Sequence, residues 1–215
     1  SFLCHVLYDF NKESMAVAER LPNLLNNYKN SEFVVGPHSI YGCSEETLLK
    51  AKDLAEKYGA KIHMHLSETR KEVYDCQKQK GVRPAEYLEK IGFLAKDVIA
   101  AHCCWLTKNE INILARHGVA VVHCPTANMK LASGGAMPFQ ELRDAGVNIA
   151  LGTDGAASNN SLNMFSEVKF AALIHKYHKW DATIAKAEEV LNIATMNAAK
   201  ALGINSGKIE EGANA

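Results

Sequence analysis

Short apolar segments alternate with longer amphipathic segments along most of this chain. The short segments are rich in β-branched residues, which favours strands, and the longer ones have the spacing of helices that bury one face. The pattern predicts strands at residues 2–8, 32–37, 61–66, 98–102, 119–124 and 147–152. It predicts helices at residues 12–29, 44–58, 70–79, 84–91, 107–117, 138–145, 161–178 and 181–202.

Several predicted helices have recognisable start and stop residues. Ser44 precedes two glutamates, which is typical of an N-cap followed by an acidic first turn. Thr107 and Glu110 have the spacing of a capping box. A glycine follows three of the helices, where a left-handed residue commonly ends a helix: Gly59, Gly118 and Gly146.

The alternation of strands and helices predicts an α/β fold with a parallel sheet. The strands are almost entirely apolar, as expected when both faces of a sheet are buried. Six predicted strands are fewer than the eight of a complete (β/α)8 barrel, and a doubly wound open sheet fits this count better. No glycine-rich phosphate-binding segment follows a strand, so a dinucleotide site of the Rossmann type has no support.

The composition excludes several classes of partner. Twenty-four basic and 24 acidic residues leave no formal net charge, which argues against a general nucleic-acid binder. Hydrophobic residues make up 47% of the chain, the level of a folded domain. The longest apolar runs are only a few residues long, far short of the roughly 20 that cross a membrane. We therefore expect neither a nucleic-acid nor a membrane partner.

The cysteines and the chain ends suggest a cytoplasmic protein that is part of something longer. Cys103 and Cys104 are adjacent and most of the other four cysteines lie in apolar runs, which favours reduced, buried thiols. The first residues lack the features of a signal peptide. The chain begins within a strand and stops in a turn-like segment, so we expect a piece of a longer protein.

Polar residues gather where the predicted strands end. Five of the predicted strands end in, or are directly followed by, a residue whose side chain can bind a metal or transfer a proton: His38, His65, His102, His123 and Asp154. A single histidine in such a place is more often a packed residue. The carboxyl ends of parallel strands meet at one edge, however, and all five should converge there. Imidazoles and a carboxylate on rigid strand ends suit zinc or iron.

Two neighbours of His65 have more than one interpretation. His63 lies two residues earlier and on the same face of its strand, so the pair could grip a metal, or His63 could pack more deeply. Glu68 follows three residues later, where it could shuttle a proton or supply a negative charge to the next helix. We expect no functional role for four other histidines: His5, His117, His175 and His178.

Two familiar zinc patterns do not fit. His102, Cys103 and Cys104 together with His123 and Cys124 lack the spacing of a zinc ribbon or finger. The cytidine-deaminase signature, a His-x-Glu with a Pro-Cys-x-x-Cys, is also absent.

Six segments together resemble the amidohydrolase superfamily. They are GPH at 36–38, CS at 43–44, HLSET at 65–69, AH at 101–102, HCPTANMKLASG at 123–134 and GTDGAASNN at 152–160. Within the superfamily they are most similar to the methylthioadenosine/S-adenosylhomocysteine deaminases. The 5′-deoxyadenosine deaminases and the triazine chlorohydrolases are near relatives. The resemblance covers essentially the whole chain.

The resemblance implies a (β/α)8 barrel with one metal ion per site, Zn2+ or alternatively Fe2+. It implies His65 and Asp154 as metal ligands, with Asp154 also catalytic. Glu68 would exchange a proton with a purine ring nitrogen, His102 would contact the attacking water or the substrate, and His38 would lie near the sugar. Three more residues fall in matching segments without an assigned role: Asn128, Ser158 and Asn159.

The chain departs from the family in what it lacks. The family takes two further metal ligands from a His-x-His on its first strand, which is absent here. Residues 1–205 would form strands three to eight of the barrel, and residues 206–215 would begin a truncated C-terminal β-sandwich. Because an open barrel has two bare edges, we expect the chain to pair with a second copy or with its missing half. The family implies a homo-oligomer.

The activity implied by the resemblance is metal-dependent hydrolytic deamination of an adenine nucleoside, with release of ammonia. Methylthioadenosine, S-adenosylhomocysteine and 5′-deoxyadenosine are the implied substrates. Another amidohydrolase activity, such as that of a guanine deaminase or a triazine chlorohydrolase, remains an alternative. A catalytically incomplete fragment with a role in structure or assembly is another.

Overall fold

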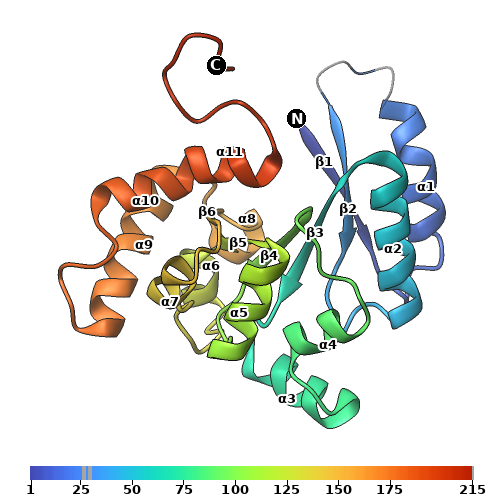
Figure 1. The fold of residues 1–215 in the computed structure, drawn as a ribbon, viewed down its shortest axis with the longest axis horizontal. Helices are drawn as coiled ribbons and strands as arrows, with labels where there is room; N and C mark the ends of the chain where they lie inside the picture. The colour runs from blue at the N-terminus through green and yellow to red at the C-terminus, as the bar shows by residue number, and fades with distance from the viewer. Residues whose placement is uncertain (26–27, 29–30, 215) are drawn as a thin grey trace.

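The computed structural model describes residues 1–25, 28 and 31–214 (Figure 1). Its strands are β1 (Phe2–Leu7), β2 (Glu32–Pro37), β3 (Lys61–Leu66), β4 (Val98–His102), β5 (Ala120–His123) and β6 (Ile149–Leu151). Its helices are α1 (Ser14–Leu25), α2 (Glu45–Tyr58), α3 (Arg70–Lys80), α4 (Pro84–Lys90), α5 (Lys108–His117), α6 (Pro125–Lys130), α7 (Phe139–Asp144), α8 (Ala156–Asn159), α9 (Met164–Lys179), α10 (Ala187–Ala194) and α11 (Met196–Leu202).

The strands form one parallel sheet in the order β1-β2-β3-β4-β5-β6, the same as their order in the chain. A doubly wound sheet reverses its strand order at a switch point, so that alternative was wrong. In a βα barrel each strand is added beside the previous one, as it is here. Within the described ranges β1 pairs only with β2 and β6 only with β5, which leaves the sheet open at both edges.

The two faces of the sheet have different surroundings. One face packs against the helices and forms the main core, to which the strands contribute alternate residues: Leu7, Val35, Ile62, Met64, Leu66, Val98, Ala100, Val121, Ile149 and Leu151. On the other face Ile99 and Ala120 pack against Ala201 of α11. Val6 of the edge strand β1 remains 43% exposed. The polar strand ends therefore lie beside a face that the described chain covers only in part.

The helix ends follow their local sequence signals. The Ser44 side chain accepts a hydrogen bond from the backbone N–H of Thr47, and Thr107 and Glu110 form the predicted capping box. Each glycine predicted to follow a helix has a positive φ: Gly59 (60°), Gly118 (67°) and Gly146 (78°). These predictions are confirmed because caps depend on a few adjacent residues.

Other helix predictions differ from the structure. The segment predicted as one helix at 181–202 forms α10 and α11, which are separated at Thr195, where φ is −125° and ψ is −91°. The short helices α6 and α8 follow β5 and β6 in segments where no helix was predicted. The helix predicted at 12–29 is α1, and residues 26, 27 and 29 of that prediction lie outside the described residues.

Residues 203–214 form no strand in the described structure. Asn205 holds this segment in a loop, because its side chain donates to the carbonyl of Gly212 and its carbonyl accepts from the N–H of Asn214. The assignment of residues 206–215 to a β-sandwich therefore stays a prediction.

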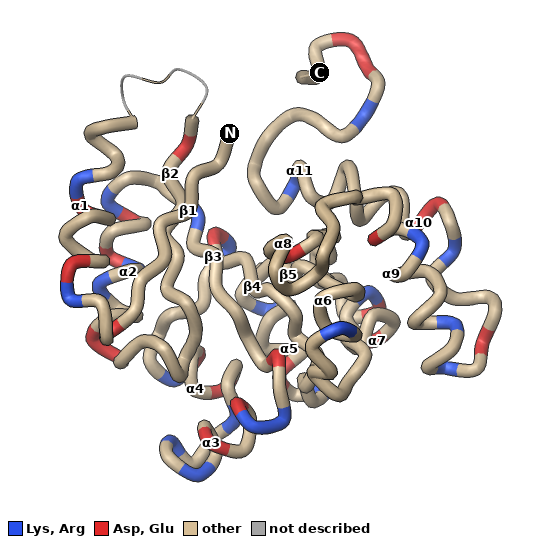
Figure 2. Tube along the Cα trace, turned by 180° about the vertical axis from the view of Figure 1, so that it is seen from behind, with Lys and Arg blue, Asp and Glu red and all other residues tan. Residues whose placement is uncertain are grey.

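Acidic and basic side chains are interspersed over the helices rather than gathered by sign (Figure 2). No helix in the described part of the chain is long and apolar enough to span a membrane. All six cysteines are free, and five of them are buried, with Cys4 the exposed one. The prediction that the cysteines are mostly buried is confirmed.

Candidate active site

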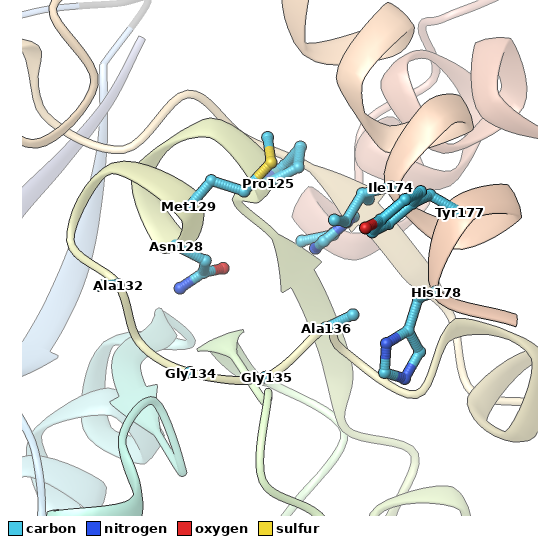
Figure 3. Close-up of a pocket in the computed structure, with 11 residues that line it drawn as sticks. Pro125, Asn128, Met129, Ala132, Gly134, Gly135, Ala136, Ile174, Tyr177 and His178 are labelled. Carbon is cyan, nitrogen blue, oxygen red and sulfur yellow. The ribbon is translucent and has the colours of Figure 1, made fainter.

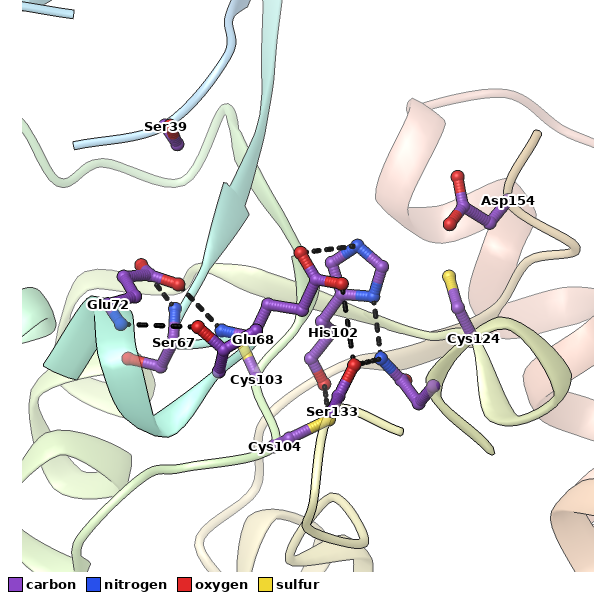
Figure 4. A network of polar contacts seen from close by, with 12 residues as sticks. Ser39, Ser67, Glu68, Glu72, His102, Cys103, Cys104, Cys124, Ser133 and Asp154 are labelled. Carbon is purple, nitrogen blue, oxygen red and sulfur yellow. Dashed lines mark hydrogen bonds and ion pairs between the residues drawn. The ribbon is translucent and has the colours of Figure 1, made fainter. Parts of the chain in front are cut away.

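Three imidazole rings form a row across the carboxyl ends of β2, β3 and β4. The ring of His65 lies 4.5 Å from that of His38 and 5.1 Å from that of His102, measured between ring centroids. Asp154 follows β6 and lies on the other side of His102, where its negative charge acts on that imidazole (Figure 4). The structure therefore brings together four of the five strand-end residues.

The backbone at these strand ends is strained. The φ angles of Ser67 (49°), His102 (72°), Cys103 (51°) and Asp154 (60°) fall in the left-handed region, which costs a residue with a side chain about 1 kcal/mol or more. Register places His102 beside Leu66, whose side chain lies in the core. The left-handed turn at His102 departs from strand geometry, and its ring lies beside His65 instead.

A cavity of about 210 Å³ opens on the face of the sheet opposite the main core. Its lining residues come from the first three strands and the turn after β2: Cys4, Val6, Gly36, His38, His63, Met64 and His65. Gly36 lets β1 and β2 approach closely, since a Cβ there would lie 2.5 Å from Cys4 Sγ. The cavity thus places apolar surface beside two of the clustered imidazoles.

Two tyrosine rings lie beside His38. Its ring lies 4.3 Å from that of Tyr8 and 5.5 Å from that of Tyr41, and its Nδ1 is 2.8 Å from Ser39 Oγ. Burial, followed by the nearby His65 and His102, lowers the pKa of His38 to about 4. His38 is therefore neutral at pH 7 and presents one donor and one acceptor.

Glu68, Ser133, Asn128 and His102 form a closed ring of polar contacts (Figure 4). Ser133 Oγ lies 3.4 Å from Glu68 Oε1, and Asn128 Nδ2 lies 3.4 Å from Ser133 Oγ. Asn128 Nδ2 is 3.0 Å from His102 Nδ1, and His102 Nε2 is 3.9 Å from Glu68 Oε2. Burial lowers the pKa of His102, so this imidazole is neutral at pH 7.

A buried glutamate holds Glu68 in place. The carboxylate of Glu72 accepts the backbone N–H groups of Ser67 and Glu68, each at 2.8 Å. Burial raises the pKa of Glu72 to about 7. Both bonds fix the turn that carries the chain from β3 into α3, so Glu72 fixes the backbone from which Glu68 reaches the site.

A second buried glutamate fixes the turn that carries Asp154. Asn159 Nδ2 donates to the carbonyl of Thr153 at 2.7 Å and to Glu167 Oε1 at 2.8 Å. The other oxygen of Glu167 accepts from the backbone N–H of Thr126 at 3.3 Å. The loop after β6 is in this way tied to both α9 and α6.

Neither Glu72 nor Glu167 was predicted from the sequence to have a role. Thr69 and Glu72 have the spacing of a capping box, and Thr69 does cap α3, which is a signal that could have identified the position. Ser133 lies within a segment that supports the family resemblance. Glu167 lies in the first turn of α9 and has no signal that separates it from an ordinary helix charge.

His123 does not join the imidazole row. Register places it beside Leu151 on the helix-covered face, and its Nε2 lies 3.1 Å from the Nε2 of His175 in α9. His175, which lies on a helix and for which we expected no functional role, is only 2% exposed. A separate cavity of about 340 Å³ lies beside His123 between α6 and α9, with Ile174 and Tyr177 on its wall (Figure 3).

The described residues do not form a complete metal site by themselves. Nδ1 of His65 is buried without a partner, and Asp154 Oδ1 accepts from the N–H of Gly155 at 2.6 Å. These are the two residues predicted to bind a metal ion, and zinc usually takes four ligands. In the part of the chain that the structure describes, no three His, Cys, Asp or Glu side chains lie close enough together to hold a metal ion.

Comparisons with known proteins identify relatives of this chain. The chain is 48% identical over 208 residues to a 5′-deoxyadenosine deaminase of Methanothrix thermoacetophila. The matched region covers 95% of this chain and 49% of that protein. It is 52% identical over 178 residues to 5-methylthioadenosine/S-adenosylhomocysteine deaminase 1 of Archaeoglobus fulgidus, which covers 83% of this chain and 42% of that protein.

Among solved structures, an adenosine deaminase from Xanthomonas campestris with bound zinc superposes with a TM-score of 0.92. It is 38% identical and covers 97% of this chain and 49% of that one. The chain thus spans about half the length of the curated relatives it matches. The model of the "Amidohydrolase family" matches residues 5–215, and the chain therefore belongs to the amidohydrolase family.

Proposed function

We propose that this chain is part of a hydrolase that deaminates adenine nucleosides and releases ammonia. The observation that carries the proposal is the position of Glu68 beside His102, with Nε2 and Oε2 3.9 Å apart, at the strand ends that also hold His65 and Asp154. Such a pair of proton-exchanging groups is what hydrolysis of an amidine requires. The roughly 50% identity to deaminases of this class supports it.

In this reaction water adds to C6 of the adenine ring and ammonia leaves, which gives an inosine-type product. Glu68 takes one proton from the attacking water and passes it to the ring nitrogen next to C6, while His102 orients that water. Asp154 accepts the second proton of the water and passes it to the departing amine, which leaves as ammonia. When bound by the whole protein, a divalent metal makes water acidic enough to attack near neutral pH. His65 and Asp154 supply two of its ligands.

The substrate is an adenine nucleoside with a small or extended 5′-substituent. His38 stands at the edge of the cavity and is neutral, so it suits a sugar hydroxyl better than a charged group. The ring of Tyr8, tilted by 32° against that of His38 with centroids 4.3 Å apart, limits how His38 can turn. We assign the nucleoside sugar to this side of the site.

The sheet is the larger part of an eight-stranded barrel, as strands three to eight. Its open edges at β1 and β6 and the exposed Val6 on β1 support this assignment. Activity therefore belongs to the whole protein, which we propose forms a homo-oligomer. Five buried free thiols fit the reducing environment of the cytoplasm.

The test measures ammonia release by the whole protein from methylthioadenosine, S-adenosylhomocysteine and 5′-deoxyadenosine. We expect turnover of at least one of them, and Glu68→Gln and Asp154→Asn should each lose most of it. Glu19→Gln and Asp53→Asn make the same chemical changes on exposed helix positions and should keep it. A zinc-loaded whole protein that releases no ammonia from any of the three would contradict the proposal.

A further inference from the structure

The ring of Glu68, Ser133, Asn128 and His102 has a definite direction of hydrogen bonding. Ser133 has a single hydroxyl proton, and the carboxylate of Glu68 can only accept it. Ser133 Oγ then has only lone pairs left for Asn128. The group of Asn128 that faces Ser133 must therefore be the amide nitrogen, because an oxygen there would meet lone pairs.

The same nitrogen faces His102. Asn128 Nδ2 carries two protons, one for Ser133 Oγ at 3.4 Å and the other for His102 Nδ1 at 3.0 Å. Nδ1 of His102 is therefore an acceptor and carries no proton. With no proton on Nδ1, the ring can carry a proton only on Nε2, the atom that faces Glu68 Oε2.

We propose that Asn128 is a positioning residue that holds His102 in the Nε2–H tautomer, so that the histidine presents a proton toward Glu68 and the reacting atoms. The inference rests on the proposed function for its purpose, but its geometry stands on this chain alone. Asn128 acts through His102 and touches none of the reacting atoms itself.

The surroundings of Asn128 support this role over simple packing. Asn128 is 6% exposed, and its Oδ1 is buried without a hydrogen-bond partner. Both hydrogen bonds of this amide are made by its Nδ2 group. Ser133 is itself held by the indole N–H of Trp105, which donates to its carbonyl at 2.8 Å. The amide is thus oriented by its two donated bonds.

The test is the tautomer of His102 in the 215-residue chain, read by NMR from the ring 15N shifts. The signals are assigned by their loss in His102→Gln. The wild-type chain should show a protonated Nε2 and an unprotonated Nδ1. Asn128→Asp replaces the donor with an isosteric acceptor and should move the proton to Nδ1. Asn128→Ala removes the bond and should give a mixture of both tautomers.

Two further variants separate this role from general disturbance of the site. Ser133→Ala breaks the ring but leaves the bond from Asn128 to His102, so the Nε2–H tautomer should persist. Asn109→Asp makes the same chemical change on an exposed turn of α5 and should alter nothing. If Asn128→Asp does not fold, the proposal is tested by comparing the His102 tautomers of the other two variants. Asn128→Ala should show a mixture, and Ser133→Ala should keep the Nε2–H tautomer. An Nδ1–H tautomer in the wild type, or an unchanged one in both Asn128 variants, overturns the proposal.

The NMR measurement uses neither metal nor substrate, so its outcome is independent of the proposed activity. In an active whole protein, Asn128→Asp should lower kcat about ten-fold or more while KM changes little, because proton delivery and not binding is affected. A change in KM alone would overturn the positioning role. An inactive whole protein with the expected NMR result would contradict the proposed function only.

Discussion

The Nε2 atoms of His123 and His175 lie 3.1 Å apart, although 52 residues separate them in the chain. Both side chains are only 2% exposed, and His175 also stacks on Phe139 with ring centroids 4.8 Å apart. One imidazole nitrogen donates its proton to the other, and burial, which lowers the pKa of both histidines, keeps both rings neutral in the folded chain at pH 7. The pair joins β5 to α9 beneath the candidate site.

This pair predicts that the chain loses stability in mild acid. Burial, followed by the positive charge of His178, lowers the pKa of His175 to about 4, and burial also lowers the pKa of His123. In the unfolded chain both should titrate near 6.5. The unfolded state therefore binds protons first, and stability present above pH 6.5 is lost as the pH falls toward 4. For His175 the loss is about 3 kcal/mol.

The measurement is urea unfolding at several pH values between 7.5 and 4. His175→Gln keeps an amide donor near His123 but cannot titrate, so the slope of stability against pH should become shallower than in the wild type. His178→Gln, on the exposed side of the same helix, removes a charge that lowers the pKa of His175, so its slope should fall between those of the wild type and His175→Gln. Equal slopes for His175→Gln and wild type would contradict the prediction.

Gly36 should not tolerate even one added methyl group. A Cβ there would lie 2.5 Å from Cys4 Sγ and 2.8 Å from the carbonyl oxygen of His5. We expect Gly36→Ala to destabilise the chain by about 1–3 kcal/mol through overpacking. Gly155→Ala, where nothing lies within 4 Å and φ is −70°, should have a much smaller effect.

The measurement for this contact is the midpoint of denaturant unfolding. Adding Cys4→Ala to Gly36→Ala removes the sulfur but not the backbone oxygen, so it should restore part of the lost stability and not all of it. A double variant no more stable than Gly36→Ala would show that the sulfur contact is unimportant.

Asn159 should contribute to stability through the loop that carries Asp154. Asn159→Ala removes the donor to Thr153 and Glu167 and leaves buried acceptors unpaired, which costs about 1–3 kcal/mol. Thermal unfolding should occur several degrees lower, whereas Asn109→Ala on an exposed helix position should change it little. An unchanged melting temperature for Asn159→Ala would mean that water replaces its amide.

The 215-residue chain alone should retain much less than one zinc ion per chain after dialysis. No three His, Cys, Asp or Glu side chains among its described residues lie close enough to hold a metal ion, and zinc usually takes four ligands. Elemental analysis of the dialysed chain checks this, with the whole protein as the comparison, which should keep about one. A full equivalent on the isolated chain would mean that a neighbouring side chain or a second copy completes the site.

The alternation of elements could be predicted from the sequence because it depends on local periodicity and on caps of a few residues. Ser44, Thr107 and Gly118 mark helix ends in the sequence and in the structure alike. The convergence of His38, His65 and Asp154 also followed from one rule, that parallel strands end at the same edge. These features need no knowledge of which distant residues touch.

The local sequence did not predict the face of the sheet on which a strand-end residue projects. His102 and His123 both end strands, yet the left-handed backbone of His102 brings it to the site, while His123 follows its ladder into the helix layer. Which one turns depends on the packing of the loops that follow. A motif that lists both histidines cannot separate them.

The amino-acid sequence alone determined the α/β class, the strand ends that hold the chemistry and the family resemblance, because each depends on residue type and short spacing. Only the tertiary structure decided the sequential strand order with its two open edges, the buried pair of His123 and His175, and the ring that joins Glu68 to Asn128. These features join residues tens of positions apart, and such contacts form only when burial brings the segments together. Residue types and short spacings therefore indicate the chemistry of this chain, whereas the fold determines which atom donates the proton in each hydrogen bond.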